Sequence, residues 1–540
     1  MVWFVANGIV CFGANGDWNS GGTDYGSGGS SDSGSTSQGK RDQHRHCSFI
    51  GVQYRRFLSH SYLALGTYDV SIEAAGFQSQ TSRATIELNR TTVLNINVAV
   101  AGTQQAITIS DAAPIVDVTS GQIRRSVNED LIETIPIAGR DFRQLFRIIP
   151  GFQSNPTAGQ DNFTLSSGSS ASFNGTGTRS AIFQTDGIAN DDNSENQNRQ
   201  SVNISTIKEF QVLTNNFTAE FGRGAGAIVL VQTKSGTNDF HGEAYWQLTN
   251  TALNARTYFQ NAAGSRIDPG TGNLVPNVVV PSSKTHRPGG VFGGPIVKDK
   301  LFFFGSYERF WSPGSANSTI SLIPPEFRTP RVDPSLPDAA ERRAWVQSII
   351  DRYPNVAPNN TVTNPYGYTA SVKRTNQNQD MTGRVDYNIS ERDILYGRYQ
   401  YGDTLIQNEE LVRGQNAKQD HAFQNAGLTW THIFSPRWSG EGRFGFGRRN
   451  MLVGLVDGDN VPIVSFTGAN TPTNIGNAGQ YPLKRVQNDF QYVYNVATQL
   501  GSKHTTSASG QTHAAISSTK TSSRCIVGSG PSMPPARSQP

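Results

Sequence analysis

The stretch from Ser205 to Trp246 reads STIKEFQVLTNNFTAEFGRGAGAIVLVQTKSGTNDFHGEAYW, and it decides the fold. Within it, Ala227–Val231 is an apolar, β-branched run that indicates a strand buried on both faces. After Lys234–Asn238 the pattern changes to strict alternation of apolar and polar residues, which is typical of a strand with one apolar face. A small globular domain therefore ends here and an amphipathic sheet begins.

Downstream of this junction the same alternation recurs in paired segments. Met381–Ile389 places apolar side chains at every second position, and the turn Ser390–Asp393 leads into a second such segment, Ile394–Gly402. Segments of about 9–11 residues can cross a bilayer at a tilt, and short turns alternating with long connections are typical of outer-membrane barrels. We predict eight membrane strands: 240–249, 288–297, 301–311, 381–389, 394–402, 425–434, 438–448 and 487–497.

Upstream of the junction, residues 121–236 predict a small α+β domain. Ser126 and Glu129 have the spacing of a capping box ahead of one helix, and Arg140–Ile149 has the apolar spacing of a second helix. The strands that these helices would cover are expected around 172–175, 182–185 and 207–213, and Asp186-Gly187-Ile188 indicates a tight turn.

The first hundred residues divide into two parts. Residues 66–100 alternate as β-strands and resemble the second half of a carboxypeptidase-regulatory-like β-sandwich, with the opening strands missing. Residues 1–65 contain a Gly/Ser tract and do not look like a folded domain. No basic residue precedes the apolar start, so a signal peptide is a poor match, and we expect a non-native or out-of-frame start.

The composition excludes several classes of function. A net charge of +4 in 540 residues is too small to indicate a nucleic-acid partner. The three cysteines, Cys11, Cys47 and Cys525, have no metal-ligand spacing, so we expect no metal site and no cofactor. The sequence contains neither a nucleophile elbow nor a metalloprotease motif, so we expect no catalytic residues and no enzyme.

Two local motifs have more ordinary interpretations than their composition suggests. The glycines of Gly222–Gly226 precede a strand rather than a helix, so close backbone packing is favoured over a nucleotide site. Asp191–Asn196 is rich in oxygen ligands but lacks the spacing of a calcium loop, and we interpret it as a solvated loop.

The string GGPIVKDKLFFFGSYERF, residues 293–310, resembles the Oar-like group of TonB-dependent outer-membrane receptors. Asn174-Gly175 and Asp186-Gly187 match the dipeptides that flank a plug strand in that family, and the resemblance covers residues 66–505. It implies a mostly β fold: a partial β-sandwich, an α+β plug at 121–236, and the N-terminal part of an antiparallel transmembrane barrel at 237–505. The tail, 506–540, resembles nothing in the family and shows no strand pattern.

The resemblance also implies partners and a location. The linker 101–120 contains an extended patch, Ile107, Thr108, Ile109 and Ser110, which is the candidate TonB box; it would pair as an added strand with a TonB-type energy transducer. The other partners are outer-membrane lipid and an extracellular ligand of unknown identity, carbohydrate or peptide. The short turns, at 298–300, 390–393 and 435–437, would then face the periplasm.

A plugged barrel of this type needs about 22 strands, far more than the eight counted. We therefore expect a fragment that does not transport by itself. The alternative class is a surface adhesion or carbohydrate-binding β protein, in which Trp246, Trp311, Trp430 and Trp438 would line a sugar groove rather than form a membrane belt. A secreted β-rich hydrolase would need an acid pair, and the sequence offers no candidate for one.

Overall fold

The computed structural model describes most of the chain from Gly121 to Thr521 and seven strands before it. Residues 15–44, 96–120 and 522–540, together with shorter stretches, lie outside the described part. In the part that the structure describes, no helix is both long and apolar enough to cross a membrane.

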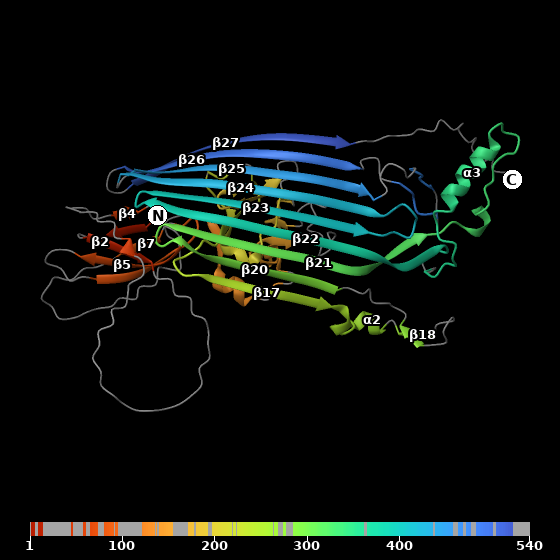
Figure 1. Cartoon of the computed structure of the whole chain (residues 1–540), viewed down its shortest axis with the longest axis horizontal. Helices are drawn as coiled ribbons and strands as arrows, with labels where there is room; N and C mark the ends of the chain where they lie inside the picture. The colour runs from red at the N-terminus through yellow and green to blue at the C-terminus, as the bar shows by residue number, and fades with distance from the viewer. Residues whose placement is uncertain are drawn as a thin grey trace, which may run out of the picture.

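The largest element is one antiparallel sheet of nine strands, joined in chain order from β17 to β27 (Figure 1). The eight predicted membrane strands are all present. Their bounds, with the ninth strand last, are β17 (His241–Asn250), β20 (Lys284–Val297), β21 (Leu301–Ser321), β22 (Gly367–Ser390), β23 (Asp393–Asn408), β24 (Ala417–Ser435), β25 (Trp438–Leu455), β26 (Leu483–Leu500) and β27 (His504–Thr521). Among the described strands, β17 and β27 form the two edges of this sheet.

The ninth strand corrects the prediction that residues 506–540 have no strand. β27 pairs with β26 along its whole length, from Leu483↔Thr521 to Leu500↔His504. Its sequence is rich in Ser, Thr and Ala and shows no apolar alternation, so the hydrophobic pattern does not reveal it. A backbone ladder needs only exposed N–H and C=O groups on a neighbouring edge, and β26 provides one.

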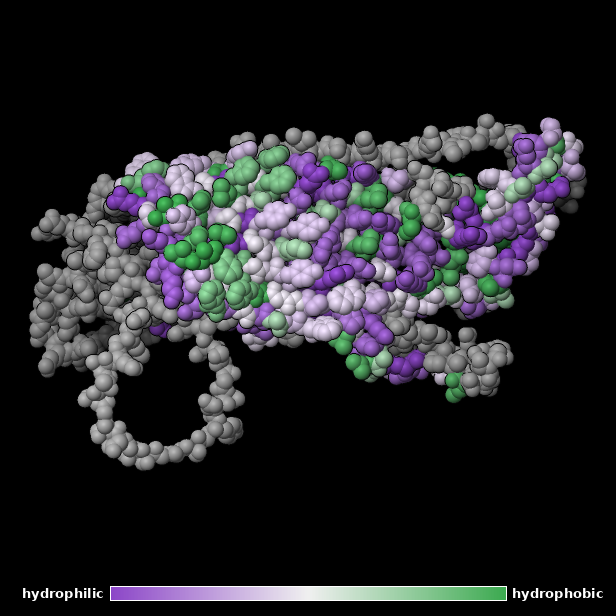
Figure 2. All heavy atoms as spheres, in the orientation of Figure 1, coloured by the Kyte–Doolittle hydropathy of each residue, from purple (hydrophilic) through white to green (hydrophobic). Residues whose placement is uncertain are grey.

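The two faces of the sheet differ as the alternation predicts. On β22, Met381, Val385 and Tyr387 are 40%, 44% and 40% exposed, whereas Thr382 and Arg384 are only 6% and 7% exposed. Figure 2 shows hydrophobic and weakly polar residues over much of the outward face, with hydrophilic residues gathered toward the end that carries α3. The apolar face therefore points away from the molecule, as a lipid-facing surface does, and the polar face points inward.

Several strands continue beyond the length that a bilayer needs. β21 and β22 pair from Leu301↔Tyr387 as far as Ser321↔Gly367, so much of the connection expected at 312–380 is strand. The remainder folds around α3 (Ala339–Ile350), where a cluster including Ile349, Ile350 and Tyr353 is buried. The other elements of the long connections are η4 (Thr251–Leu253), α2 (Tyr258–Ala262), β18 (Ser265–Ile267), β19 (Leu274–Pro276) and η5 (Pro325–Phe327).

The predicted α+β domain, here called the plug, has a five-stranded sheet in the order β12-β11-β16-β15-β8. Helix α1 and the 3-10 helix η2 contribute to the main apolar core of the plug. The strand at Ala227–Val231 is confirmed, and alternate side chains along it enter two separate apolar clusters. The bounds are β8 (Ile123–Asn128), α1 (Glu129–Thr134), η2 (Phe142–Ile148), β9 (Phe152–Ser154), β10 (Ala171–Phe173), β11 (Ala181–Thr185), β12 (Ile188–Ala189), β13 (Asp191–Asp192), β14 (Gln197–Asn198), η3 (Ile204–Thr206), β15 (Ile207–Asn215) and β16 (Ala227–Thr233).

Both predicted plug helices are shorter than expected. Ser126 lies in β8, because the edge of β15 pairs with this segment, and Asn128 caps α1 instead by accepting a hydrogen bond from Leu131 N at 3.2 Å. The segment expected to be a second α-helix is the 3-10 helix η2, capped by Asp141.

Within residues 1–65, which we expected not to form a folded domain, the described residues include four strands, while residues 15–44 lie outside the described part. β1 (Val2–Val5) joins β4 (Leu58–His60) and β7 (Thr92–Asn95) in one sheet. β2 (Ile9–Ala14) joins β3 (Arg45–His46), β5 (Gly66–Glu73) and β6 (Gln80–Ile86) in another. The apolar start is thus strand, and it supplies the partners that seemed missing. We call β1–β7 the N-terminal β unit.

The N-terminal β unit and α3 lie at opposite ends of the long axis of the molecule, and the plug lies beside the nine-stranded sheet. Figure 1 shows the N-terminal β unit at one end of the nine-stranded sheet and α3 and α2 at the other end. Contacts between the plug strands and the inward face of the sheet position the plug against the barrel wall.

Candidate functional site

The predicted turn at Asp186-Gly187 is confirmed, and it is the centre of the contact between plug and barrel wall. Asp186 and Gly187 have φ angles of 50° and 73°, as a tight hairpin turn between β11 and β12 requires. The Asp186 carboxylate accepts hydrogen bonds from the backbone N–H and the hydroxyl of Thr233, both at 2.8 Å. These bonds fix the turn on the neighbouring strand β16.

The same carboxylate reaches across to the barrel. Arg398 Nε of β23 lies 2.7 Å from Asp186, and Arg384 Nη1 of β22 lies 3.4 Å away. All three side chains are buried, at 2%, 3% and 7% exposure. Asn425 accepts a further hydrogen bond from Arg398 at 2.6 Å. A buried charge is costly unless it is paired, so this arrangement locks the turn to two strands at once.

Immediately after the turn, the plug backbone approaches the barrel closely. Asn425 Nδ2 donates to Ala189 O at 2.9 Å, and Gln491 accepts from Ala189 N at 2.7 Å. A Cβ added at Gly427 or Gly445 would lie 2.8 Å or 2.6 Å from the Ile188 side chain. Glycine at these two barrel positions therefore makes room for the plug.

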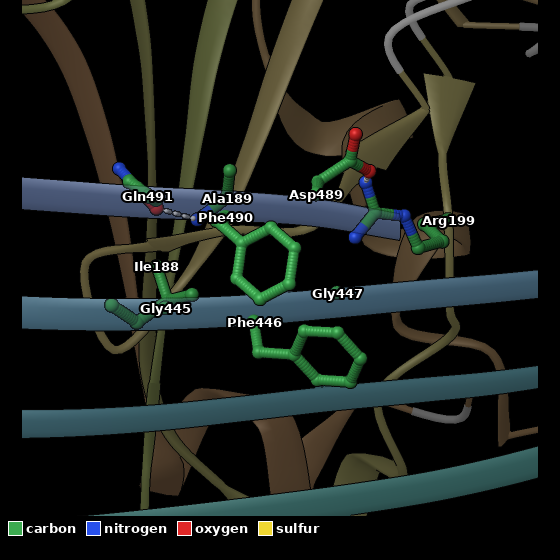
Figure 3. Close-up of a pocket in the computed structure, with 9 residues that line it drawn as sticks. All are labelled: Ile188, Ala189, Arg199, Gly445, Phe446, Gly447, Asp489, Phe490 and Gln491. Atoms are coloured by element: carbon green, nitrogen blue, oxygen red, sulfur yellow. Dashed lines mark hydrogen bonds and ion pairs between the residues drawn. The ribbon is translucent and has the colours of Figure 1, made fainter. Parts of the chain in front are cut away.

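A second ionic contact joins the next plug hairpin to β25 and β26. Arg449 pairs with Asp192 of β13, and Arg199, just after β14, pairs with Asp489. Figure 3 shows the Arg199 guanidinium beside the Asp489 carboxylate and the hydrogen bond from Ala189 to Gln491. The space between these side chains holds a cavity of about 10 Å³, room for one water molecule rather than a ligand.

This contact corrects the interpretation of Asp191–Asn196 as a solvated loop for Asp191 and Asp192, while residues 193–196 lie outside the described part. Asp191 and Asp192 are 1% and 0% exposed and form a short strand that pairs with β14. The prediction was wrong because Asp192 has a cationic partner 257 residues later in the chain, which the local sequence does not reveal. Among the described residues, no group of three or more His, Cys, Asp or Glu side chains has the arrangement of a metal site.

A third contact ties the plug to the first barrel strands. The Arg140 guanidinium lies 4.0 Å from the ring centroid of Tyr245 on β17 and 3.5 Å from Glu308 on β21. Tyr245 donates to Glu308 at 2.7 Å, and Arg287 of β20 pairs with the same carboxylate at 2.7 Å. Asn203 of the plug donates to the Tyr245 hydroxyl at 3.1 Å.

Three other predicted features are the candidate TonB box, the glycine run before β16 and the exposed tryptophans. Ile107, Thr108, Ile109 and Ser110 lie outside the described residues. Two glycines of the run before β16 serve close packing as predicted: a Cβ would lie 2.9 Å from Ile228 at Gly224 and 2.3 Å from Ser180 Oγ at Gly226. Gly222 has open space around its Cβ instead. Trp246, Trp430 and Trp438 are 66%, 42% and 47% exposed, and on their strands they alternate with residues of the opposite, polar face.

The comparisons with known proteins agree with this division. Residues 117–229 match the family described as TonB-dependent Receptor Plug Domain, and residues 232–524 match the Outer membrane beta barrel domain, which covers more than half of the chain. The TonB-dependent transporter Oar of Myxococcus xanthus is 28% identical over 269 residues, which are 48% of this chain and 23% of that protein. This chain thus spans about a quarter of the length of that relative.

Two solved structures are similar at low identity. The outer membrane transporter YddB from Escherichia coli is 11% identical, with a TM-score of 0.49 over 73% of this chain and 48% of that chain. A mutant of the ferric enterobactin receptor PfeA from Pseudomonas aeruginosa is also 11% identical, with a TM-score of 0.43 over 72% of this chain and 48% of that chain.

Proposed function

We propose a transport function from the premise that this chain belongs to the TonB-dependent outer-membrane receptors of the Oar-like group. Members of this family are outer-membrane proteins and act as transporters rather than enzymes. The activity proposed for the receptor with a closed barrel is uptake of an extracellular ligand, a carbohydrate or a peptide, past the plug. A TonB-type energy transducer would supply the force by binding the linker 101–120.

The observation that carries this proposal is the paired interface between plug and barrel wall. Asp186, Asp192 and Arg199 of the plug each meet an opposite charge on a barrel strand, and these plug side chains are at most 2% exposed. Such pairs hold the plug in register. When the plug moves away, water can hydrate both charges of each pair. A plug fastened in this way suits a gate that is pulled open and returns.

The end of the sheet that carries α3 is the proposed outer end. Phe327 and Trp345 are 54% and 56% exposed there, beside the buried cluster around Ile349 and Tyr353. Exposed aromatic side chains on a folded connection can contact either a sugar ring or an apolar peptide side chain. This surface supports both proposed ligand classes.

A substitution in the linker tests the proposed transducer contact. Proline at Thr108 removes a backbone donor from Ile107–Ser110, so strand addition with the C-terminal domain of a TonB-type protein should fail. We expect at least tenfold weaker binding for Thr108→Pro and unchanged binding for Thr103→Pro, which lies outside the patch. Undiminished binding of the Thr108 variant would sink the linker assignment, and a receptor that engages no TonB domain would favour an adhesion role.

A further inference from the structure

The turn between β6 and β7 carries an apolar residue at its tip. Leu88 and Asn89 are its central residues, and Asn89 has a φ of 49°, a left-handed conformation that asparagine tolerates. Arg90 bridges to Glu87 at 2.7 Å and holds the turn in shape. Turn tips usually carry polar side chains, so a leucine here calls for a surface that covers it.

That surface is the second face of the plug sheet. Along β16, Val229 and Val231 enter the main plug core, whereas Ile228 and Leu230 point to the opposite face, as the two-residue period of a strand requires. Leu88 packs against this second face. The buried members of the cluster that it contacts are Ile182, Leu213, Phe221, Ile228 and Leu230, with Phe217 beside them.

Plug side chains also satisfy the backbone of the turn. Leu88 N donates to both carboxylate oxygens of Glu209, at 3.1 and 3.2 Å, and Gln211 Nε2 donates to Leu88 O at 3.0 Å. Arg124 Nη1 donates to Asn89 O at 2.7 Å. Glu209 and Gln211 are 6% and 0% exposed, so the turn seals a polar strip of β15 as well as an apolar one.

The contact connects the parts of the chain that lie before and after the linker. The chain leaves the N-terminal β unit at Asn95 and the described chain resumes at Gly121, close to Arg124. The docked turn therefore ties the N-terminal β unit to the plug near the start of β8. Thr108, in the candidate TonB box, lies in the sequence between these two parts, 13 residues after Asn95 and 13 residues before Gly121.

We propose that the Leu88 turn is a releasable clasp between the N-terminal β unit and the plug. It opens before the plug sheet or the plug–barrel ion pairs separate. The clasp consists of one half-buried leucine and three donor groups, whereas β15 alone pairs with two neighbouring strands. The link to pulling rests on the proposed transport function, but the docking and its release do not.

Hydrogen–deuterium exchange tests the clasp in the receptor folded in detergent micelles, with no ligand or transducer present. Leu88→Ala should raise exchange about tenfold in residues 87–92 and also in 213–222, where the covered face becomes open. Arg124→Ala should raise exchange in 87–92 by about threefold, and Leu88→Met should behave as the unmodified protein.

Val70→Ala is the matched control, because Val70 is fully buried in the N-terminal β unit and stands outside the turn. It should raise exchange in β5 and β6 and leave 213–222 unchanged. The clasp is refuted if Leu88→Ala leaves exchange in 213–222 at the level of the unmodified protein. Failure of ligand uptake would not alter any of these outcomes, so the two proposals are tested separately.

Discussion

The plug is held on two sides by different chemistry. Toward the barrel it is fastened by buried ion pairs, with Asp186–Arg398 and Asp192–Arg449 nearly inaccessible to solvent. Toward the N-terminal β unit it is covered by one turn, with Leu88 half-buried over an apolar cluster. The first contact involves charges from several strands of each partner, and the second involves one leucine and the backbone of its turn.

This difference predicts different responses to damage. A buried ion pair resists substitution, because removing one partner leaves the other charge unpaired in a poorly solvated site. Separating the two partners of an ion pair costs less than removing one of them, because water then hydrates both charges. An apolar contact behaves differently, since its loss on substitution scales with the area uncovered. Substitutions that change one interface at a time should therefore separate the two kinds of contact.

The largest effect is expected at the centre of the ionic interface. Asp186→Asn removes the charge that faces Arg398 and Arg384 and should lower the free energy of plug unfolding by about 3 kcal/mol. Urea denaturation followed by exchange in residues 181–192 measures this. Asp420→Asn is the control, because that pair with Lys418 lies on the surface of β24; a loss as large there would show that pairing in general, not burial, matters.

A smaller effect is expected from the backbone of the same turn. Gly187 has a φ of 73°, and an added Cβ would lie 2.7 Å from the Arg443 guanidinium. Gly187→Ala should therefore cost about 1–2 kcal/mol of plug stability, measured in the same way. Gly383→Ala has open space around its Cβ and should be nearly silent. Equal losses from the two variants would contradict the close approach of turn and wall.

The smallest effect is expected from pH on the clasp. Burial raises the pKa of Glu209 from an ordinary 4.5 to about 7. The charge of Glu87 also raises this pKa, and the charge of Lys208 lowers it. Arg90 and Arg124 are the other charges nearby. The docked state therefore binds the proton more tightly than an undocked, solvated state would. Docking is strongest below pH 4.5 and weakens as the pH rises through 7.

Between pH 5 and pH 8 we expect about a tenfold change in exchange of residues 87–92, beyond the intrinsic effect of pH on exchange. Glu209→Gln keeps the acceptor for Leu88 N–H and should flatten this dependence. A Glu209→Gln protein with an unchanged pH profile would assign the effect to another group.

Local pattern predicts the strands and turns of this molecule well, since hydrophobic period and turn residues are local properties. The alternation over Met381–Ile389 and the Asp186-Gly187 turn both appear in the structure. The ionic interface could not be predicted in the same way. The alternation over Met381–Ile389 puts Arg384 on the polar face of its strand, but its partner, Asp186, lies 198 residues earlier.

Strand β27 and the buried pair Asp191–Asp192 could not be predicted because each depends on a partner outside its own segment. A strand without apolar alternation forms because a neighbouring edge offers backbone partners, and a carboxylate is buried because an arginine elsewhere pairs with it. An inward-facing arginine on an alternating strand, such as Arg398, was the available signal. A buried arginine needs an anionic partner, so an inward-facing arginine predicts a buried carboxylate from another part of the chain.

The order in which the two interfaces open is the most direct test of this account. Hydrogen exchange of the receptor in micelles, measured across a urea series, reports residues 87–92 and 181–192 in one sample. We predict that residues 87–92 lose protection at a distinctly lower urea concentration, while residues 181–192 stay protected until the plug unfolds. Loss of protection in both segments at one concentration, or first at 181–192, would contradict the account.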